Sequence, residues 1–236
     1  FDGSGTAGNP YLDPVHSDNI DLSYEWYYAD ASMFSFALFY KDIDSTIFLG
    51  NEQVPLEVGD ELFLVRTYDN FPGTKIKGIE ANLVHAFDNL PGLFSYTGLI
   101  LNYTYTDENS DLVDQEGDQI DRRRLSSDSY NAIAYYDDGR FSLRLAYNWR
   151  GKFVRRENVN LGFARPEFLP EYEKARGQLD LSANYTFSPR LKVYFTAVNL
   201  NDSKTERFMK HEELVNYISF AGRRYTLGLT YRLGMN

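Results

Sequence analysis

The feature that most constrains this chain is a strict alternation of apolar and polar residues. In the segment 225–233, tyrosine and leucine occupy every odd position, whereas threonine, glycine and arginine occupy the even ones. Successive side chains of a β-strand point to opposite faces, so this pattern predicts a strand with one apolar and one polar side. Similar segments recur along the chain, and the sequence is therefore predicted to fold as an all-β protein.

The joins between these segments also alternate, in length. Short turns alternate with long polar stretches; the short turns are at 30–32, 88–92, 137–139 and 188–190. Antiparallel strands with short turns at one end and long loops at the other are typical of a transmembrane β-barrel in an outer membrane. Nine transmembrane strands are predicted, at about 18–29, 33–47, 74–87, 93–106, 128–136, 141–150, 178–187, 191–200 and 225–233. The alternation is too weak in 128–136 and 191–200 to assign their faces.

Composition agrees with a barrel and excludes several other classes. Aromatic residues make up 16% of the 236 residues, as expected for a barrel with aromatic girdles at both membrane interfaces. No run of eighteen apolar residues predicts a transmembrane helix. The net charge of -10 argues against a nucleic-acid partner, which would require a basic surface. A large soluble β-sandwich is the alternative, but sandwiches lack the short–long rhythm of joins.

An odd number of strands has a consequence of its own. In a closed up-and-down barrel of nine strands, the first and last strands would lie parallel, and an open sheet edge cannot remain in lipid. We therefore expect this chain to form part of a larger barrel.

Several stretches of the chain resemble the TonB-dependent outer-membrane receptors, and they occur in the family's order. The matching stretches are Gly8 to Pro14, Ser17 to Leu22, Thr74 to Glu80, Asn102 to Asp107, Ala146 to Arg150, Asn199 to Asp202 and Gly222 to Gly228. The resemblance implies a 22-stranded barrel in the outer membrane of a Gram-negative bacterium, with residues 1–236 as its last nine strands. It also implies active uptake of a scarce nutrient, powered by the TonB complex of the inner membrane.

Two departures from the family pattern bear on this reading. The family usually ends on an aromatic residue, and Leu233 takes that place here. The plug domain and TonB box, which are N-terminal in the family, have no counterpart in residues 1–236, so we expect a receptor cleaved or divided in an extracellular loop. The implied partners are the N-terminal remainder of the receptor (plug and earlier strands), TonB through that part, outer-membrane lipid and lipopolysaccharide, and a small-molecule or oligosaccharide ligand.

The ligand is predicted from subgroup likeness and from side-chain chemistry. The stretches 90–105 and 135–150 look most like the subgroup tied to carbohydrate uptake, and the expected extracellular loops 49–73 and 151–173 carry aromatic and basic residues suited to sugars. Lumen residues and the upper end of the strand 141–150 add further candidates. The residues predicted to bind ligand are Tyr68, Phe71, Arg144, Trp149, Arg150, Arg155, Phe163, Phe168 and Tyr172. For each loop aromatic the plainer alternative is packing within the loop.

Three function classes stay open at this point. The first is a TonB-dependent transporter of oligosaccharides, with a ferric-siderophore receptor of the same fold as its near rival. Anionic ferric chelates would favour clustered arginine and lysine, whereas these loops are mostly acidic with aromatic patches. An outer-membrane barrel enzyme needs a catalytic set, for which only His211 with Glu212 and Glu213 offers a candidate. A passive porin would have no plug. We predict no enzyme activity, since no nucleophile motif is present, and no cofactor or metal, since the three histidines are far apart and the calcium-like spacing at 107–111 has no turn glycine.

Overall fold

The computed structural model describes residues 4–50, 54–59, 61–110, 117–120, 124–160 and 168–233. These residues form fifteen strands and one short 3-10 helix, η1. The elements are β1 (Ser4–Ala7), β2 (Ser17–Ala29), β3 (Ser32–Leu49), β4 (Val54–Val58), β5 (Glu61–Ala86), η1 (Gly92–Tyr96), β6 (Thr97–Ser110), β7 (Asp128–Asp137), β8 (Phe141–Arg150), β9 (Phe153–Asn160), β10 (Phe168–Glu173), β11 (Arg176–Ser188), β12 (Leu191–Val198), β13 (Thr205–Met209), β14 (Val215–Ser219) and β15 (Arg224–Tyr231).

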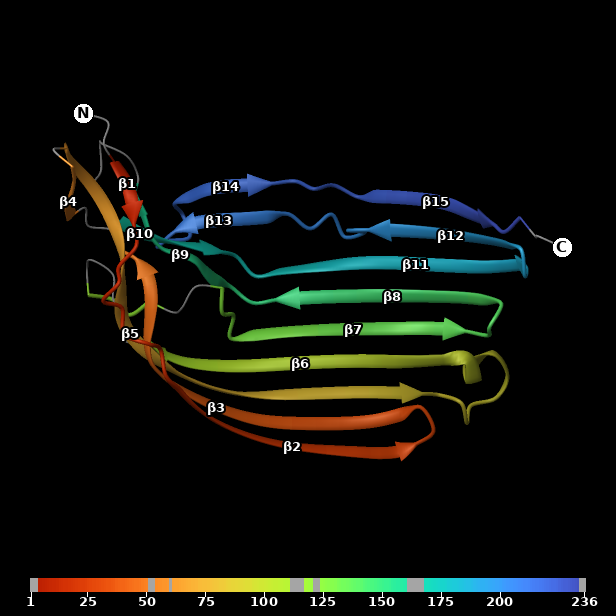
Figure 1. The fold of residues 1–236 in the computed structure, drawn as a ribbon. Coiled ribbons are helices and arrows are strands. Elements are labelled where there is room, and N and C mark those ends of the chain that lie inside the picture. Colours follow the sequence, from red (N-terminus) through yellow and green to blue (C-terminus); the bar gives the residue numbers. More distant parts are fainter. Residues whose placement is uncertain are drawn as a thin grey trace.

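Nine long strands form one antiparallel wall, in the order β15-β12-β11-β8-β7-β6-β5-β3-β2 (Figure 1). This confirms the nine predicted strands, and the wall is open, with β2 and β15 at its edges. Two boundaries were wrong. The strand predicted from residue 93 begins at Thr97, because residues 92–96 form η1, and the strand predicted from residue 74 begins at Glu61. Among the described residues no helix is long and apolar enough to cross a membrane.

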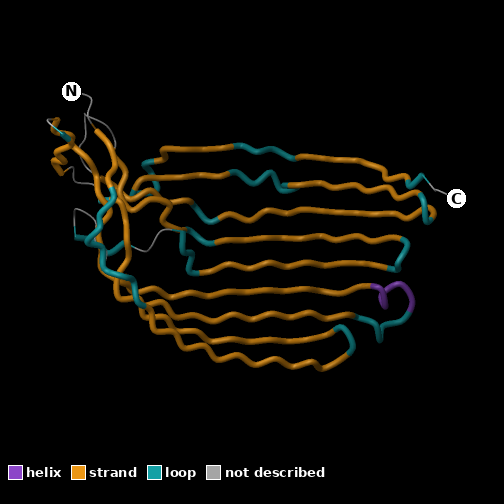
Figure 2. Tube along the Cα trace, viewed as in Figure 1, coloured by secondary structure: helices purple, strands orange, loops and turns teal. Residues whose placement is uncertain are grey.

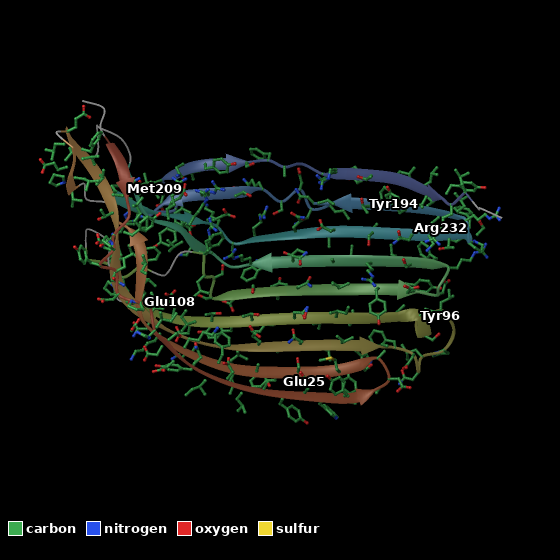
Figure 3. All side chains as sticks on the ribbon, in the orientation of Figure 1. Glu25, Tyr96, Glu108, Tyr194, Met209 and Arg232 are labelled. Atoms are coloured by element: carbon green, nitrogen blue, oxygen red, sulfur yellow. The ribbon has the colours of Figure 1, made fainter. Side chains whose placement is uncertain are left out.

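The two ends of the wall differ as the rhythm of joins predicts. Figure 2 shows the short turns together at one end, with the C-terminus, and the long connections at the other, with the N-terminus. Figure 3 labels Tyr96 and Arg232 at the short-turn end and Met209 at the long-connection end. The Asp137–Gly139 turn forms as predicted, with the Asp138 carboxylate accepting from the backbone N–H groups of Arg140 and Phe141.

The long connections are strands rather than irregular loops, which corrects two of the sequence predictions. The expected loop 151–173 contains β9 and β10, and with β13 and β14 they form a second sheet in the order β14-β13-β10-β9. The expected loop 49–73 contains β4 and the outer half of β5, which also pairs with β1 and β3. Backbone groups in long connections need partners, and pairing between neighbouring connections supplies them.

The second sheet continues the wall, because β9, β10, β13 and β14 extend β8, β11, β12 and β15 in the same order. The break between the two sheets is stabilised by two asparagines of the family-like stretch 199–202. Asn199 has a φ of 61°, a left-handed conformation that asparagine tolerates, and its Nδ2 donates to the carbonyls of Ser203 and Gly222. Asn201 Nδ2 donates to the Gly177 carbonyl. Residues 199–202 therefore connect the start of β11 with the segments that lead into β13 and β15, where the wall ends.

The register of the wall places side chains of one kind on each face. Across β2 and β3, for example, Leu22 lies opposite Leu38 and Ser23 opposite Ala37. Following the register also assigns the two strands whose faces the sequence left open. On β7 the apolar face holds Tyr130, Ala132, Ala134 and Tyr136, and on β12 it holds Leu191, Val193, Phe195 and Ala197. The wall thus has one continuous apolar face and one polar face.

Candidate functional site

A pocket of about 330 Å³ lies on the polar face of the wall, where β8 ends and β9 begins and where β10 ends and β11 begins. We call it the mouth pocket. Its lining combines cationic, amide and aromatic side chains with one carboxylate. The lining residues are Asn148, Trp149, Arg150, Phe153, Glu173, Lys174, Arg176 and Gln178.

Two arginines face each other across this pocket. Arg150, the last residue of β8, pairs in register with Arg176, the first residue of β11. Like charges directly opposite each other in a sheet destabilise it. Within the described part of the chain, neither guanidinium has a carboxylate within ion-pair distance, although nine such pairs form elsewhere. Arg150 and Arg176 therefore form no ion pair with a described carboxylate, although the Glu173 carboxylate in the same pocket attracts Arg150.

Neighbouring groups fix the orientation of both arginines. Arg150 Nε donates to Ser126 Oγ at 2.8 Å, and its guanidinium also donates to the backbone carbonyl of Arg124. The Arg150 guanidinium carbon lies 3.9 Å from the centre of the Phe153 ring, within the range of a cation–π contact. Arg176 Nη1 donates to Thr205 Oγ1 at 3.3 Å. These contacts use only part of the five N–H donors of each guanidinium.

The remaining charged residues of the pocket are paired outside it. Glu173 binds Arg207 at 3.2 Å from Nε, and Lys174 binds Glu206 at 3.3 Å from Nζ. The Glu206 pKa lies below its usual value because Lys204 and Lys174 both bind its carboxylate. The net positive charge of the mouth pocket thus comes from Arg150 and Arg176.

This arrangement can bind an anion with planar acceptor groups. Guanidinium groups present paired N–H donors that match carboxylate, phosphate and similar oxygens. The Asn148 and Gln178 amides beside them add neutral donors and acceptors, and Phe153 adds an aromatic face.

The structure brings two of the predicted ligand residues to this pocket, Arg150 and Trp149. Arg150 lies on its polar side. Trp149 touches the pocket, but the register puts it on the apolar face, where its ring stacks on Tyr130 at 5.3 Å. Arg144 shares the polar face with Arg150 but lies six residues along the same strand, or about 20 Å away.

The predicted residues of the long connections lie elsewhere. Tyr68 and Phe71 are on the outer half of β5, where the Phe71 ring lies 5.8 Å from that of Phe48. Arg155 binds Glu171 at 2.7 Å, and the Tyr172 ring stacks on Phe208 at 5.3 Å.

Two further predicted residues cannot be placed in a site. Phe163 lies outside the described residues. Phe168 begins β10, and its side chain is not among those described.

Sequence reasoning missed Arg176, although a signal for it was present. Arg176 precedes Gln178 by two residues and so belongs to the polar face of the same strand. Its pairing with Arg150 could not be read from the chain, because residues 151–175 separate the two strands and long connections leave register open.

An open antiparallel wall with one apolar and one polar face, and a cationic pocket at its long-connection end, is the architecture of an outer-membrane β-barrel that handles solutes. The family model described as "TonB dependent receptor-like, beta-barrel" matches residues 1–200. The chain belongs to this family, which places it in the outer membrane of a Gram-negative bacterium.

Three of the solved structures that match this chain illustrate the likeness. The siderophore receptor PirA from Acinetobacter baumannii matches with a TM-score of 0.61 and 17% identity, over 93% of this chain and 32% of that one. The ferripyoverdine receptor of Pseudomonas aeruginosa, bound to ferripyoverdine, matches with a TM-score of 0.64 and 15% identity, over 93% and 27%. The ferric-catecholate import receptor Fiu from E. coli K12 matches with 0.61 and 14%, over 93% and 28%.

This chain therefore spans about a third of the length of the receptors that it matches. At these identities the likeness supports the fold. No curated protein matches the chain.

Proposed function

We propose that this chain is the C-terminal part of the barrel wall of a receptor that takes up an anionic ligand, a ferric chelate, across the outer membrane. The observation that carries the proposal is the pair of arginines in the mouth pocket, Arg150 and Arg176, which lie opposite each other and form no ion pair with a described carboxylate. Ferric chelates with carboxylate or catecholate donors carry negative charge, and guanidinium groups bind such oxygens. The solved neighbours named as siderophore receptors support the same reading.

Uptake of an oligosaccharide is the second candidate, and one observation favours it. Asn148, Gln178 and Phe153 line the same pocket, and amides with an aromatic face suit sugar hydroxyl groups and the C–H surface of a sugar ring. A neutral sugar, however, leaves the two opposed positive charges without a partner. For this reason we place the ferric chelate first.

The energy source and the gate belong to the proposal as well. The family relation supports a receptor whose remaining residues supply the earlier strands, a plug in the lumen and the contact with TonB. The described residues contain no cluster of histidine, cysteine and carboxylate that could hold a metal ion, so iron would arrive and leave within its chelator.

The test is a binding measurement on the full-length receptor with two probes, ferric enterobactin and a neutral maltodextrin. We expect Arg150→Ala and Arg176→Ala each to weaken binding of the ferric chelate by about 10- to 100-fold, because hydrogen bonds to charged groups contribute about 1.5–3 kcal/mol. Added salt should weaken wild-type binding, since the attraction is electrostatic.

The matched control is Lys192→Ala, which removes a cation from the polar face near the short-turn end. This variant should bind like the wild type. Tight binding of maltodextrin that both arginine variants retain would reverse the order of the two candidates.

A further inference from the structure

One connection at the short-turn end of the wall is apolar, whereas the others are polar. The other three short turns carry aspartate, serine or arginine. The connection 87–96, between β5 and β6, instead presents large apolar side chains that are strongly exposed: Leu93 at 71%, Phe94 at 66% and Leu90 at 43%. Within this connection, η1 has no buried residue. Exposed apolar side chains that lie together mark a surface that binds something else.

Aromatic contacts tie both ends of this connection to the apolar face of the wall. At its start, the Phe87 ring lies 4.7 Å from the ring of His85. His85 is an odd-numbered residue of β5, and from residue 79 onward the odd residues of β5 lie on the apolar face. At its end, the Tyr96 ring lies 5.9 Å from that of Tyr136, which belongs to the apolar face of β7. The tip of the connection is therefore held close to this face.

The contact with Tyr136 makes the connection part of a band of aromatic rings across the short-turn end of the apolar face. Successive ring centres are 4.5–6.5 Å apart along Tyr96, Tyr136, Phe141, Tyr185 and Phe187. Tyrosine and tryptophan collect at the level where lipid tails meet head groups. Short turns of outer-membrane barrels face the periplasm, so this band marks the periplasmic boundary of the bilayer.

The local fold of η1 directs one of the exposed side chains toward the same boundary. Leu93 and Tyr96 are three residues apart in η1, and side chains three residues apart in a 3-10 helix lie one above the other. Since Tyr96 lies against the apolar face, Leu93 is on the lipid side of the wall. Gly92 adopts a φ of 66° at the start of η1, and Ser95 Oγ donates to its carbonyl at 2.8 Å. These features hold the turn in place.

We propose that the connection 87–96 is an interfacial anchor, whose apolar tip inserts among the phospholipids of the periplasmic leaflet. Apolar side chains of such a segment lie at the boundary between head groups and acyl chains. Continuity with the lipid-covered face of the wall selects this occupant over water and over another protein. Movement of the wall toward the periplasm would expose Leu93 and Phe94 to water, so the anchor resists it. The inference requires the outer membrane, to which the family assigns the chain, but no particular ligand.

The experiment uses the full-length receptor in vesicles of phosphatidylethanolamine and phosphatidylglycerol. A nitroxide spin label on Leu93→Cys reports collisions with oxygen, which concentrates in lipid, and with a water-soluble nickel chelate present on both sides of the membrane. The matched control is Asp30→Cys, on a polar short turn. We expect the ratio of oxygen to nickel collisions to be several-fold higher at position 93 than at position 30. Residues 1–236 contain no cysteine, and wild-type receptor labelled in the same way measures any background.

Two outcomes would overturn the anchor. A label at position 93 that meets the nickel chelate as often as the label at position 30 would place the tip in water. A label that meets neither probe would show that protein covers the tip. If the labelled variant does not assemble, which its migration in unheated gels would reveal, Leu93→Trp replaces it. Phospholipids brominated near the head-group end of their acyl chains should quench the added fluorescence, and unquenched fluorescence would equally reject the anchor.

Discussion

The strands of the second sheet continue four strands of the membrane wall, yet the two sheets are stabilised in opposite ways. On the wall, apolar side chains point outward even on strands with neighbours on both sides: Leu145 of β8 is 40% exposed and Leu101 of β6 39%. In the second sheet, Phe208 is 1% exposed and Val154 is fully buried. The second sheet, which we call the outer sheet, thus has a small core of its own, whereas the wall has none.

The difference follows from the solvent that each region meets. Lipid covers the apolar face of the wall, so the wall needs only backbone pairing and a supply of apolar side chains. The outer sheet extends into water and buries apolar side chains such as Phe208 and Val154 within itself, whereas Val215 and Ile218 of its edge strand β14 stay exposed. It also pairs its charges, as in the bond from Arg155 to the buried Glu171. The chain therefore passes from a lipid-covered strand, β8, to a strand of the outer sheet, β9, at the break Gly151–Lys152.

The largest expected effect on stability comes from removing a buried side chain from the core of the outer sheet. Phe208→Ala should destabilise the outer sheet by about 3–5 kcal/mol, the range for a buried phenylalanine. Because Phe208 lies in the outer sheet and its ring stacks on Tyr172 of the same sheet, heat-modifiable migration of the receptor should be unchanged. Hydrogen exchange of β10 and β13 should become much faster. Equal loss of protection in β8 and β11 would show that the two regions unfold as one.

The counterpart on the wall is a charge on the lipid-facing side. Leu227→Arg should destabilise the barrel by about 2–4 kcal/mol if position 227 is near the bilayer midplane, because lipid cannot hydrate the charge. Thr226→Arg, on the opposite face of the same strand, is the control and should be much milder. Urea unfolding in lipid vesicles measures both. An equal loss of stability in both variants would contradict the assignment of position 227 to the lipid face and position 226 to the polar face.

A close contact within the wall should give an intermediate effect. Gly98 lies under the ring of Tyr135, and a Cβ there would be 2.3 Å from two ring-end atoms, so the tyrosine has to move. Gly98→Ala should therefore cost about 1–3 kcal/mol, the usual range for overpacking. The double variant Gly98→Ala/Tyr135→Ala should recover part of this loss. No recovery would show that backbone strain, and not the ring, causes the cost.

The smallest effect is a pH response confined to the outer sheet. Burial raises the Glu171 pKa, but hydrogen bonds from Arg155 and Asn216 and the charge of Arg156 outweigh it, so the pKa lies below the ordinary 4.5. A depressed pKa stabilises the folded state fully above about 4.5, and this contribution is lost as the pH falls through the folded-state pKa.

Hydrogen exchange of β10 at pH 6 and at pH 4 measures this response. Protection should be lower at pH 4 after correction for the intrinsic rate. In Glu171→Gln the difference between the two pH values should shrink. A pH response that the glutamine variant keeps in full would assign it to another carboxylate.

The number of wall strands and the two faces of most of them could be predicted from the sequence, because side-chain alternation with period two is a local property. The short turns could also be predicted, because they depend on nearby residues. Asp138 accepts from the N–H groups of Arg140 and Phe141, and Gly139 adopts a positive φ. The odd number of predicted strands also indicated an open sheet, because nine strands cannot close as an antiparallel barrel.

The tertiary structure decided what depends on pairing between distant segments. The outer sheet forms because two long connections, which hold β9 with β10 and β13 with β14, lie side by side and share backbone hydrogen bonds between β10 and β13, which neither connection encodes alone. Register across residues 151–175 sets Arg150 opposite Arg176, and register across β8 and β11 sets Asn148 opposite Gln178 in the same pocket. A shift of one residue would move each of these side chains to the other face, so local pattern supplied the candidates and only the assembled sheet placed them together.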